Sequence, residues 1–568
     1  MATTSETGGA APPGPRKRST TTISHRVFWP SAAIVAAFVL FTVIFPGTME
    51  SGINAVQGAI IGTFGWYYTL IVSGFVVFAL WMGFGHFGDI KLSPRDEDPE
   101  FTLGSWFAML FAAGMGIGLV FWGVAEPLNH FASPKPGVEG TPSELAQQSL
   151  VQTFLHWGLH PWAIYVIVGL AIAYAIHRRD RPVSIRWALQ PLLGDRVKGW
   201  LGDAIDVAAI VGTLFGVATS LGLGVLQIAS GLSFLDLISD PGNLTYSILI
   251  GAITALAVFS VATGLKKGIK WLSNINIVIA AALVLFVLIT GPTLFIFREA
   301  VQSVGLYFQN LFQLSFDTSA LQGEDGQSWQ GSWATFYWGW WISWAPFVGV
   351  FIARISRGRT VREFVVGVLG VPTLVTFLWF TVFGGTALHR ELFGGGGLVG
   401  ADGSVDTNGS LFGLLAGLPG GTFVVAGAIV LIVLFFVTSS DSGSLVVDML
   451  ASGGNPDPPV WSRVFWASAE GLVAIALLIA GGLTALQVAA IVIAFPFSVV
   501  MLGMCVSMYK EFSSERRTQL RIQRRLQREE LTEHVSRALR EDGWSNGTGD
   551  TAAGAARDGT GSAGPTTS

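Results

Sequence analysis

The stretch that most constrains this chain is 331–354, GSWATFYWGWWISWAPFVGVFIAR, in which five tryptophans fall within twelve positions and a proline follows. At 3.6 residues per turn, one stripe of such a helix is largely aromatic. It comprises Tyr337, Trp341, Trp344 and Val348. Aromatic faces attract a cation that has no hydrogen-bond donors, at about 0.5 to 2 kcal/mol per ring. A quaternary ammonium group is therefore one expected ligand, and lipid anchoring is the alternative role.

Composition places the chain in a membrane. It is 51% hydrophobic and only 12% charged, whereas a soluble domain carries about twice that share of charge. Apolar runs of spanning length predict an all-α polytopic membrane protein with twelve transmembrane helices. The runs are 27–47, 63–85, 103–124, 152–177, 204–232, 244–263, 272–297, 333–353, 363–386, 423–442, 464–481 and 486–508.

The distribution of cationic residues predicts the orientation of these spans. If alternate loops are assigned to the cytoplasm, 30 of the 33 Lys and Arg residues fall on one side. The exceptions are Lys135, Arg298 and Arg390. Because cytoplasmic loops carry the excess of Lys and Arg, both termini are predicted to be cytoplasmic. The single cysteine, Cys505, excludes an intrachain disulfide framework.

The third span contains three alternate glycines, Gly114, Gly116 and Gly118. Each weakens a helix by about 1 kcal/mol relative to alanine. We expect a discontinuous helix whose freed carbonyls coordinate a cation near the membrane midplane. Close helix packing through a GxxxG pair is the alternative. Glu126, near the outer end of this span, is expected to make a cap or gate contact.

The fourth span supplies a second aromatic cluster. Trp157, Trp162 and Tyr165 surround Pro161, which cannot donate a backbone hydrogen bond and should kink the helix. His156 and His160 have the i, i+4 spacing of a metal pair. No third ligand lies nearby in the sequence, so polar contacts at a helix end explain them better.

Hydroxyl groups occur at membrane depth in the fifth and tenth spans. Thr213 is a candidate ion ligand, although hydroxyl-to-backbone bonding explains most such residues. In the tenth span, Thr438 and Ser439 precede a single carboxylate, Asp441. Hydroxyls beside backbone carbonyls suit sodium, whereas a divalent ion usually needs several carboxylates. We expect Asp441 to be a hydrogen-bond acceptor at the helix end.

Three motifs make the chain resemble the betaine/choline/carnitine transporters across nearly all of its membrane region. They are GMGIG at 114–118, HWGLHPW at 156–162 and FYWGWWISWAPFVGVFIARISRGR at 336–359. The resemblance implies a LeuT-like fold, in which two peripheral helices precede two inverted five-helix repeats, and a homotrimer. The organisation implied is a disordered tail (1–26), peripheral helices (27–102), the first repeat (103–297), an extracellular loop (298–332), the second repeat (333–508), a charged cytoplasmic helix (509–542) and a disordered tail (543–568).

The resemblance also implies a substrate site and ion sites. The trimethylammonium box resembles Trp157, Trp162, Tyr165 and Trp341, with Trp340 and Trp344 along the access path and Gly114, Gly116 and Gly118 beside the substrate. The sodium ligands implied are the carbonyls of Ala112, Met115 and Phe435 and the hydroxyls of Thr438 and Ser439. A second sodium site resembles Thr213 with Phe347. Here the chain departs from a betaine carrier of the family, because Val217 replaces a threonine and supplies no oxygen.

Gly118 indicates the charge of the substrate, because family members that transport choline tend to carry aspartate at this position. Glycine leaves the site without that anion and favours a zwitterion with its own carboxylate. The resemblance therefore implies sodium-coupled import of glycine betaine by alternating access in the cell membrane, for osmoprotection. Choline, ectoine or proline are alternative substrates.

Other functions fit the sequence less well. A sodium-independent antiporter would not need the hydroxyls of Thr438 and Ser439. An intramembrane enzyme would need a GxSxG motif, a Ser/His dyad or a His-rich metal site within its membrane spans, and the twelve predicted spans show none of these. A passive pore would be obstructed by two opposed aromatic clusters. We expect sodium as the coupling ion, contact with anionic membrane lipids, no cofactor and no nucleic-acid partner.

Overall fold

The computed structural model describes residues 23–114, 116–263 and 266–541. Its contacts divide the chain into two units, Met1–Lys510 and Glu511–Ser568. In the described part, nine helices are long and apolar enough to cross a membrane. The prediction of an all-helical polytopic membrane protein is confirmed at this level.

The helices have the following bounds. They are α1 (His25–Ile44), α2 (Pro46–Phe84), α3 (Leu103–Gly114), α4 (Ile117–Ala132), α5 (Pro142–Trp157), α6 (Leu159–Ala173), η1 (Tyr174–Arg178), α7 (Ile185–Ala188), α8 (Gln190–Leu193), η2 (Gly194–Lys198), α9 (Trp200–Phe234), α10 (Asn243–Thr263), α11 (Lys266–Thr290), α12 (Thr293–Ser315), α13 (Gly323–Gln330), η3 (Gly331–Thr335), α14 (Phe336–Ile355), α15 (Val361–Phe393), α16 (Ser410–Ala416), α17 (Gly421–Ala451) and α18 (Val460–Glu541).

The predicted break in the third span is confirmed. Helix α3 ends at Gly114 and α4 begins at Ile117, and between them Gly116 has extended backbone angles. A side chain at Gly116 would meet no atom within 4 Å, so close helix packing does not account for this glycine. The glycine-rich sequence therefore interrupts the helix here.

The fourth span is broken one turn before the proline. Helix α5 ends at Trp157, Gly158 has non-helical angles, and Pro161 lies in the first turn of α6. Proline has no N–H for the carbonyl four residues earlier, which belongs to Trp157. That carbonyl accepts a hydrogen bond from Thr376 Oγ1 of α15 at 2.9 Å instead.

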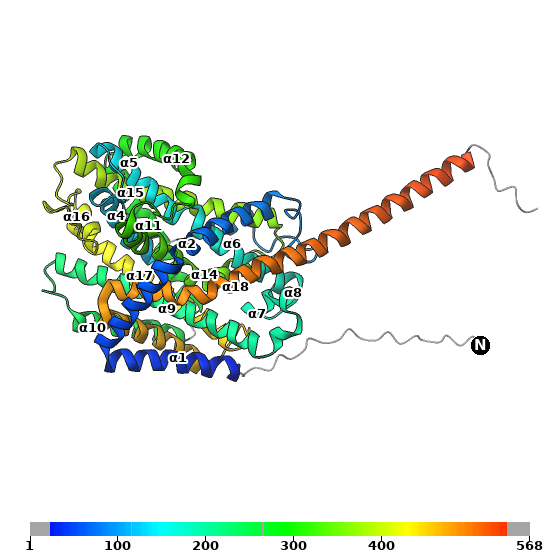
Figure 1. Cartoon of the computed structure of the whole chain (residues 1–568), viewed down its shortest axis with the longest axis horizontal. Helices are drawn as coiled ribbons and strands as arrows, with labels where there is room; N and C mark the ends of the chain where they lie inside the picture. The colour runs from blue at the N-terminus through cyan, green and yellow to red at the C-terminus, as the bar shows by residue number, and fades with distance from the viewer. Residues whose placement is uncertain (1–22, 115, 264–265, 542–568) are drawn as a thin grey trace, which may run out of the picture. The chain divides into compact units, whose positions relative to one another are not determined.

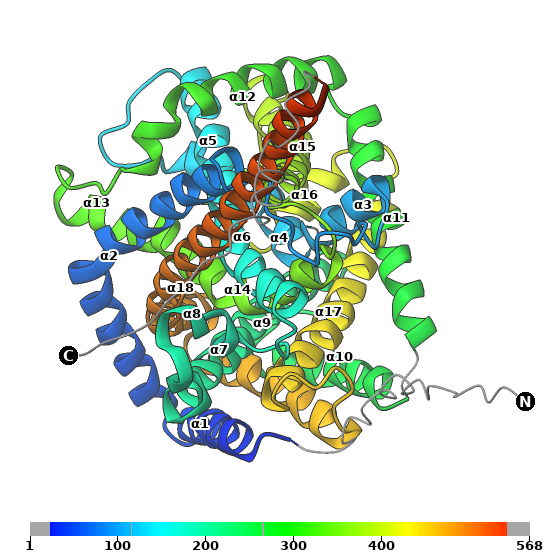
Figure 2. The same cartoon turned by 90° about the vertical axis from the view of Figure 1, so that its right-hand side faces the viewer.

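The tryptophan-rich helix α14 lies among the other long helices. It packs against α6 and α9, while α9 packs against α17 and α15 packs against α4 (Figures 1 and 2). Sixteen of the twenty residues of α14 are buried. The absence of a side chain at Gly349 allows α14 to lie close to α6, because a Cβ atom there would lie 2.6 Å from Val168 Cγ1 of α6.

Two details differ from the sequence-based picture. Much of the segment 298–332, expected to be a loop, is helical in α12 and α13. Asp441 was expected at a helix end, and this was wrong: α17 continues to Ala451, so Asp441 lies inside the helix with 7% of its surface exposed. The predicted span stops at 442, but the helix continues for nine more residues. Val446, Val447 and Met449 in these last turns are buried.

Candidate functional site

Six predicted aromatic residues line one cavity of about 50 Å³. They come from three elements: Trp157 ends α5, two belong to α6 and three to α14. The complete lining is Gly116, Ile117, Gly118, Leu119, Trp157, Pro161, Trp162, Tyr165, Ser220, Trp340, Trp341, Trp344, Val348 and Thr376. We call this space the aromatic cavity.

The rings of the aromatic cavity are packed against one another. Trp340 and Trp341 are stacked with centroids 4.6 Å apart, and Trp157 meets Trp341 edge-on at 4.9 Å. Trp162 and Tyr165 form a second edge-on pair at 5.3 Å. Such pairs add about 0.5 to 1.5 kcal/mol beyond the burial of their area, so the walls hold their shape without a ligand.

The predicted aromatic stripe of α14 lines the aromatic cavity in part, since Tyr337 is not among the lining residues and donates to Glu126 instead. Trp341, Trp344 and Val348 line the aromatic cavity, while Trp338 lies outside it and stacks on His160 at 5.2 Å. Trp340 lines the cavity as well, so the aromatic face is wider than one stripe.

Hydrogen bonds from neighbouring helices fix the indoles. Trp341 Nε1 donates to the carbonyl of His156 at 2.9 Å, and Trp340 Nε1 donates to Ser220 Oγ at 3.3 Å. The His156 carbonyl is available because the helix breaks two residues later, at Gly158. The break in the fourth span therefore orients a tryptophan of the eighth.

Behind the aromatic cavity lies a buried carboxyl group that the sequence analysis placed at a helix end. Glu126 has no exposed surface, and its Oε2 accepts hydrogen bonds from Trp157 Nε1 at 2.7 Å and from Tyr337 Oη. Its Oε1 lies 2.7 Å from His156 Nδ1 and 3.4 Å from His130 Nε2. Four side chains on three elements thus converge on Glu126. It is an internal anchor for the aromatic wall.

Glu126, His130 and His156 also form a group that could hold a metal ion, because their ligand atoms lie within 4.8 Å of one another. Hydrogen bonds already account for this arrangement: His156 Nδ1 contacts Glu126, and His156 Nε2 lies 3.1 Å from Gln152 Nε2. The predicted polar contacts are confirmed for His156. They are wrong for His160, whose two ring nitrogens are buried and have no hydrogen-bond partner among the described residues.

Gly118 is required by the packing of the cavity wall. A Cβ atom at this position would lie 2.6 Å from Trp340 Cη2 and 3.0 Å from Trp157 Cη2. Both contacts are too close for an unperturbed structure. A side chain here would displace two of the aromatic rings.

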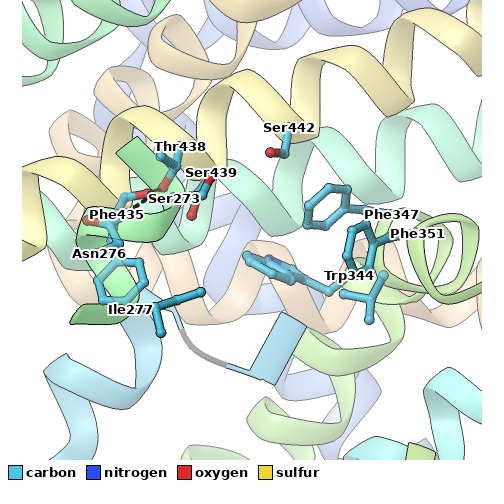
Figure 3. Close-up of a pocket in the computed structure, with 11 residues that line it drawn as sticks. Ser273, Asn276, Ile277, Trp344, Phe347, Phe351, Phe435, Thr438, Ser439 and Ser442 are labelled. Atoms are coloured by element: carbon cyan, nitrogen blue, oxygen red, sulfur yellow. Dashed lines mark hydrogen bonds between the residues drawn. The ribbon is translucent and has the colours of Figure 1, made fainter. Parts of the chain in front are cut away.

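A second cavity of about 240 Å³ adjoins the first (Figure 3). It contains the predicted residues Phe347, Phe435, Thr438 and Ser439. Its complete lining is Ser273, Asn276, Ile277, Trp344, Phe347, Val348, Phe351, Phe435, Thr438, Ser439 and Ser442. We call it the hydroxyl cavity, because four serine and threonine side chains line it. Trp344 and Val348 line both cavities and therefore lie between them.

The predicted sodium ligands are brought together only in part. Thr438, Ser439 and Phe435 share the hydroxyl cavity, and Thr438 Oγ1 lies 3.0 Å from Asn276 Nδ2 and 2.9 Å from the carbonyl of Leu434. The other two predicted ligands are the carbonyls of Ala112 and Met115. Ala112 belongs to α3, and Met115 lies outside the described residues.

The second predicted ion site has one suitable feature. Thr213 Oγ1 is buried and has no hydrogen-bond partner among the described residues. Phe347 lines the hydroxyl cavity, with its ring 5.4 Å from that of Trp344. The described contacts do not join Thr213 to Phe347.

Five polar residues of these cavities were not singled out as ligands from the sequence. Ser220 and Thr376 line the aromatic cavity, and Ser273, Asn276 and Ser442 line the hydroxyl cavity. Asn276 gave the clearest available signal, since it is an amide inside an apolar span. No comparable signal in the sequence marked Thr376, because a single hydroxyl in an apolar helix usually bonds to its own backbone.

Charge is the property that the aromatic cavity lacks. All of its lining residues in the described part of the chain are uncharged. Aromatic faces can hold a cationic group there, but no lining carboxylate balances it. The nearest carboxyl described above, Glu126, is turned to the indole N–H of Trp157 instead.

Comparison with known proteins identifies the family. Residues 26–517 match the model of BCCT, the betaine/carnitine/choline family transporter. The chain is 54% identical to an uncharacterized transporter of Mycobacterium tuberculosis, over 86% of this chain and 83% of the relative. It is 46% identical to the glycine betaine transporter OpuD of Bacillus subtilis, over 86% and 95% of the two chains. It is 40% identical to the osmo-dependent choline transporter BetT2 of Acinetobacter baylyi, over 87% and 72%. The chain is thus a transporter and not an enzyme, and it belongs to the betaine/carnitine/choline transporter family.

Proposed function

We propose that this protein imports glycine betaine together with sodium by alternating access. The observation that carries the proposal is an aromatic cavity lined by six Trp and Tyr side chains and by no charged residue. The trimethylammonium group of glycine betaine has no N–H to donate, so aromatic faces bind it without directional partners. Its own carboxylate balances the charge that the cavity wall does not.

Gly118 favours this substrate over choline. Choline is a cation without a carboxylate, and a site for it gains from a nearby anion. The cavity wall has no space for an anionic side chain at position 118, since even a Cβ atom there would lie 2.6 Å from Trp340 Cη2. Choline, ectoine and proline are the substrates to compare with glycine betaine.

Sodium coupling is supported by the hydroxyl cavity. Thr438 and Ser439 present oxygens there, beside Phe435 and across from Trp344 (Figure 3). Oxygen ligands with no carboxylate suit a monovalent ion. Each sodium ion that enters contributes about 2.3 kcal/mol per 100 mV of membrane potential, which alone supports roughly 50-fold accumulation.

We further propose twelve spans in two inverted five-helix repeats. Helix α18 is interrupted at Gly481 and Gly482, so it supplies two spans. The broken pair α3 and α4 supplies one further span and α14 another, and neither is among the nine long apolar helices of the described part. The packing pairs are exchanged as an inverted repeat requires: α14, from the second half, packs on α6, and α4, from the first half, packs on α15.

The family resemblance and the charge pattern also support a proposal for the location and orientation of the protein. We place the protein in the cell membrane with both termini in the cytoplasm, as the distribution of Lys and Arg favours. A homotrimer, contact with anionic lipids and a role in osmoprotection complete the proposal. The domain boundaries proposed from the sequence are retained.

Uptake of labelled glycine betaine into proteoliposomes tests this function. The flux is measured with and without an inward sodium gradient, at several membrane potentials. Saturable uptake that requires sodium and rises with an interior-negative potential supports the symporter. Uptake that ignores sodium but needs substrate inside the vesicle identifies an exchanger instead, and flux without saturation identifies a pore.

A further inference from the structure

A second buried carboxyl group, Glu470, lies outside both cavities. It belongs to the first part of α18 and has no exposed surface. Its Oε2 accepts a hydrogen bond from Ser440 Oγ of α17 at 3.0 Å. Its Oε1 is buried and has no hydrogen-bond partner among the described residues. One carboxyl oxygen is thus satisfied and the other is not.

On the side of α17 and α9, Glu470 Oε1 faces apolar groups. A Cβ atom on Gly443 of α17 would lie 3.1 Å from Oε1 and 3.0 Å from Val217 Cγ2 of α9. The carboxyl therefore faces the backbone of α17 and the methyl groups of a valine. On α10, the neighbouring side chain is Thr254, which lies against Gly471 and is uncharged.

The charged groups near Glu470 do not neutralise it. The titratable side chain that faces it from α17 is Asp441, which has the same sign of charge. On α18 itself, Arg463 lies two turns earlier, and its Nε is 4.0 Å from Asp448 Oδ2. An ionised carboxylate inside a membrane protein requires a partner, because leaving it unpaired costs several kcal/mol.

A proton meets this requirement, whereas a metal ion does not. Sodium would need several oxygen ligands around Oε1, but Val217 and Gly443 offer methyl groups and a Cα atom on that side. A proton needs only the carboxyl oxygen itself. Since Oε2 accepts from Ser440, the proton belongs on Oε1.

We propose that Glu470 is a proton-binding site and that its proton exchanges with water during the transport cycle. The exchange is a simple acid–base step. The carboxylate takes up one proton from the water on the outer side of the membrane and releases it to the water on the inner side. The proposal that exchange accompanies transport rests on the proposed function. The presence of the proton does not.

Helix α17 links this site to the cavities. Thr438, Ser439 and Ser442 line the hydroxyl cavity, while Ser440 on the opposite side of the same helix donates to Glu470. A movement of α17 that opens or closes the hydroxyl cavity changes the Ser440–Glu470 contact as well. Proton release is expected when that movement admits water to Oε1.

Infrared difference spectroscopy of the full chain in lipid tests the site itself. We expect the C=O stretch of a protonated carboxyl at neutral pH, lost in Glu470→Gln and retained in Asp441→Asn. Ser440→Ala removes the donor to Oε2 and should raise the frequency of the band, which keeps the proposal testable if Glu470→Gln does not fold. A band that both Glu470→Gln and Ser440→Ala leave unchanged, or that Asp441→Asn removes, overturns it.

A pH-sensitive dye sealed in proteoliposomes tests the exchange. Addition of glycine betaine should acidify the interior of vesicles with the wild-type chain, in proportion to labelled uptake. Glu470→Gln should take up betaine without acidification. Equal acidification by both proteins, or uptake by the wild type without acidification, overturns the exchange. If no betaine enters, the proposed function fails while the infrared band still reports on Glu470.

Discussion

The indole N–H of Trp157 donates a 2.7 Å hydrogen bond to Glu126 Oε2, and both side chains are buried. The same oxygen accepts from Tyr337, and Trp157 also lines the aromatic cavity. Glu126 therefore joins the third, fourth and eighth predicted spans at the back of the cavity. It acts as a positioning residue, because it does not line the cavity itself.

Glu126→Ala should raise the glycine betaine concentration needed for half-maximal uptake by about tenfold or more. The substitution leaves two buried donors, Trp157 Nε1 and Tyr337 Oη, without their acceptor, which costs about 1 to 3 kcal/mol each. Uptake kinetics of the reconstituted protein give the measurement. The matched control is Glu139→Ala, at an exposed position of the loop after α4. A normal half-saturation constant in Glu126→Ala would contradict the positioning role.

Trp162→Leu and Trp341→Leu should each reduce uptake at low betaine concentration by roughly tenfold, with normal membrane insertion. Each removes one aromatic face, worth about 0.5 to 2 kcal/mol to a bound cation, together with part of the packed wall. Trp200→Leu is the control, since Trp200 is 78% exposed at the start of α9. Full activity in both cavity variants would rule out the aromatic cavity as the binding site.

Gly118→Ala should lower uptake sharply, because its Cβ atom would meet Trp340 at 2.6 Å and Trp157 at 3.0 Å. Overpacking of this kind typically costs about 1 to 3 kcal/mol. Gly251→Ala provides a matched control within α10, where a Cβ atom meets no atom within 4 Å. Both variants should reach the membrane in equal amounts. Equal uptake by the two would show that the wall adapts and that Gly118 does not limit the site.

Thr438→Ala should raise the sodium concentration needed for half-maximal uptake by about tenfold, while Ser247→Ala should not change it. Thr438 lines the hydroxyl cavity, whereas Ser247 is an exposed residue of α10 that bonds to its own backbone at Asn243. Loss of one oxygen ligand weakens the ion site more than the substrate site. An unchanged sodium dependence in Thr438→Ala would separate the hydroxyl cavity from ion coupling.

Arg357→Gln should lower the thermal stability at neutral pH but not in strong acid. Arg357 donates to both carboxyl oxygens of Glu97, at 2.7 and 3.0 Å, and this holds the pKa of Glu97 below its usual value. The contribution is present above the unfolded pKa of about 4.3 and disappears as the pH falls through the lowered folded value.

The expected effect of Arg357→Gln is small because the pair is partly exposed to solvent. Melting curves of the detergent-solubilised wild type, both single variants and the Glu97→Gln/Arg357→Gln double variant isolate the pairwise term. A stability difference that stays constant from neutral to acidic pH would mean that the ion pair is not its source.

The sequence was sufficient to predict the helical membrane fold, the break in the third span and the six aromatic residues that line the aromatic cavity. Periodicity and glycine placement are local signals, and Trp341, Trp344 and Gly116, which they singled out, all line that cavity. It did not predict Glu126 as an internal anchor or Asp441 as a helix-interior residue. Those roles depend on which helices meet, because a buried carboxyl and an exposed one have the same local sequence context. Thr376 was missed for the same reason: its partner, the Trp157 carbonyl, lies on another helix.

The most direct test of the central claim compares glycine betaine with 3,3-dimethylbutanoate, which has the same shape and carboxylate but carbon in place of the cationic nitrogen. Both are added as competitors of labelled glycine betaine uptake in proteoliposomes with an inward sodium gradient. If the aromatic cavity recognises the cation, unlabelled glycine betaine competes at least tenfold better than the analogue without the cationic nitrogen. Equal competition by the two compounds would contradict cation recognition by the tryptophans.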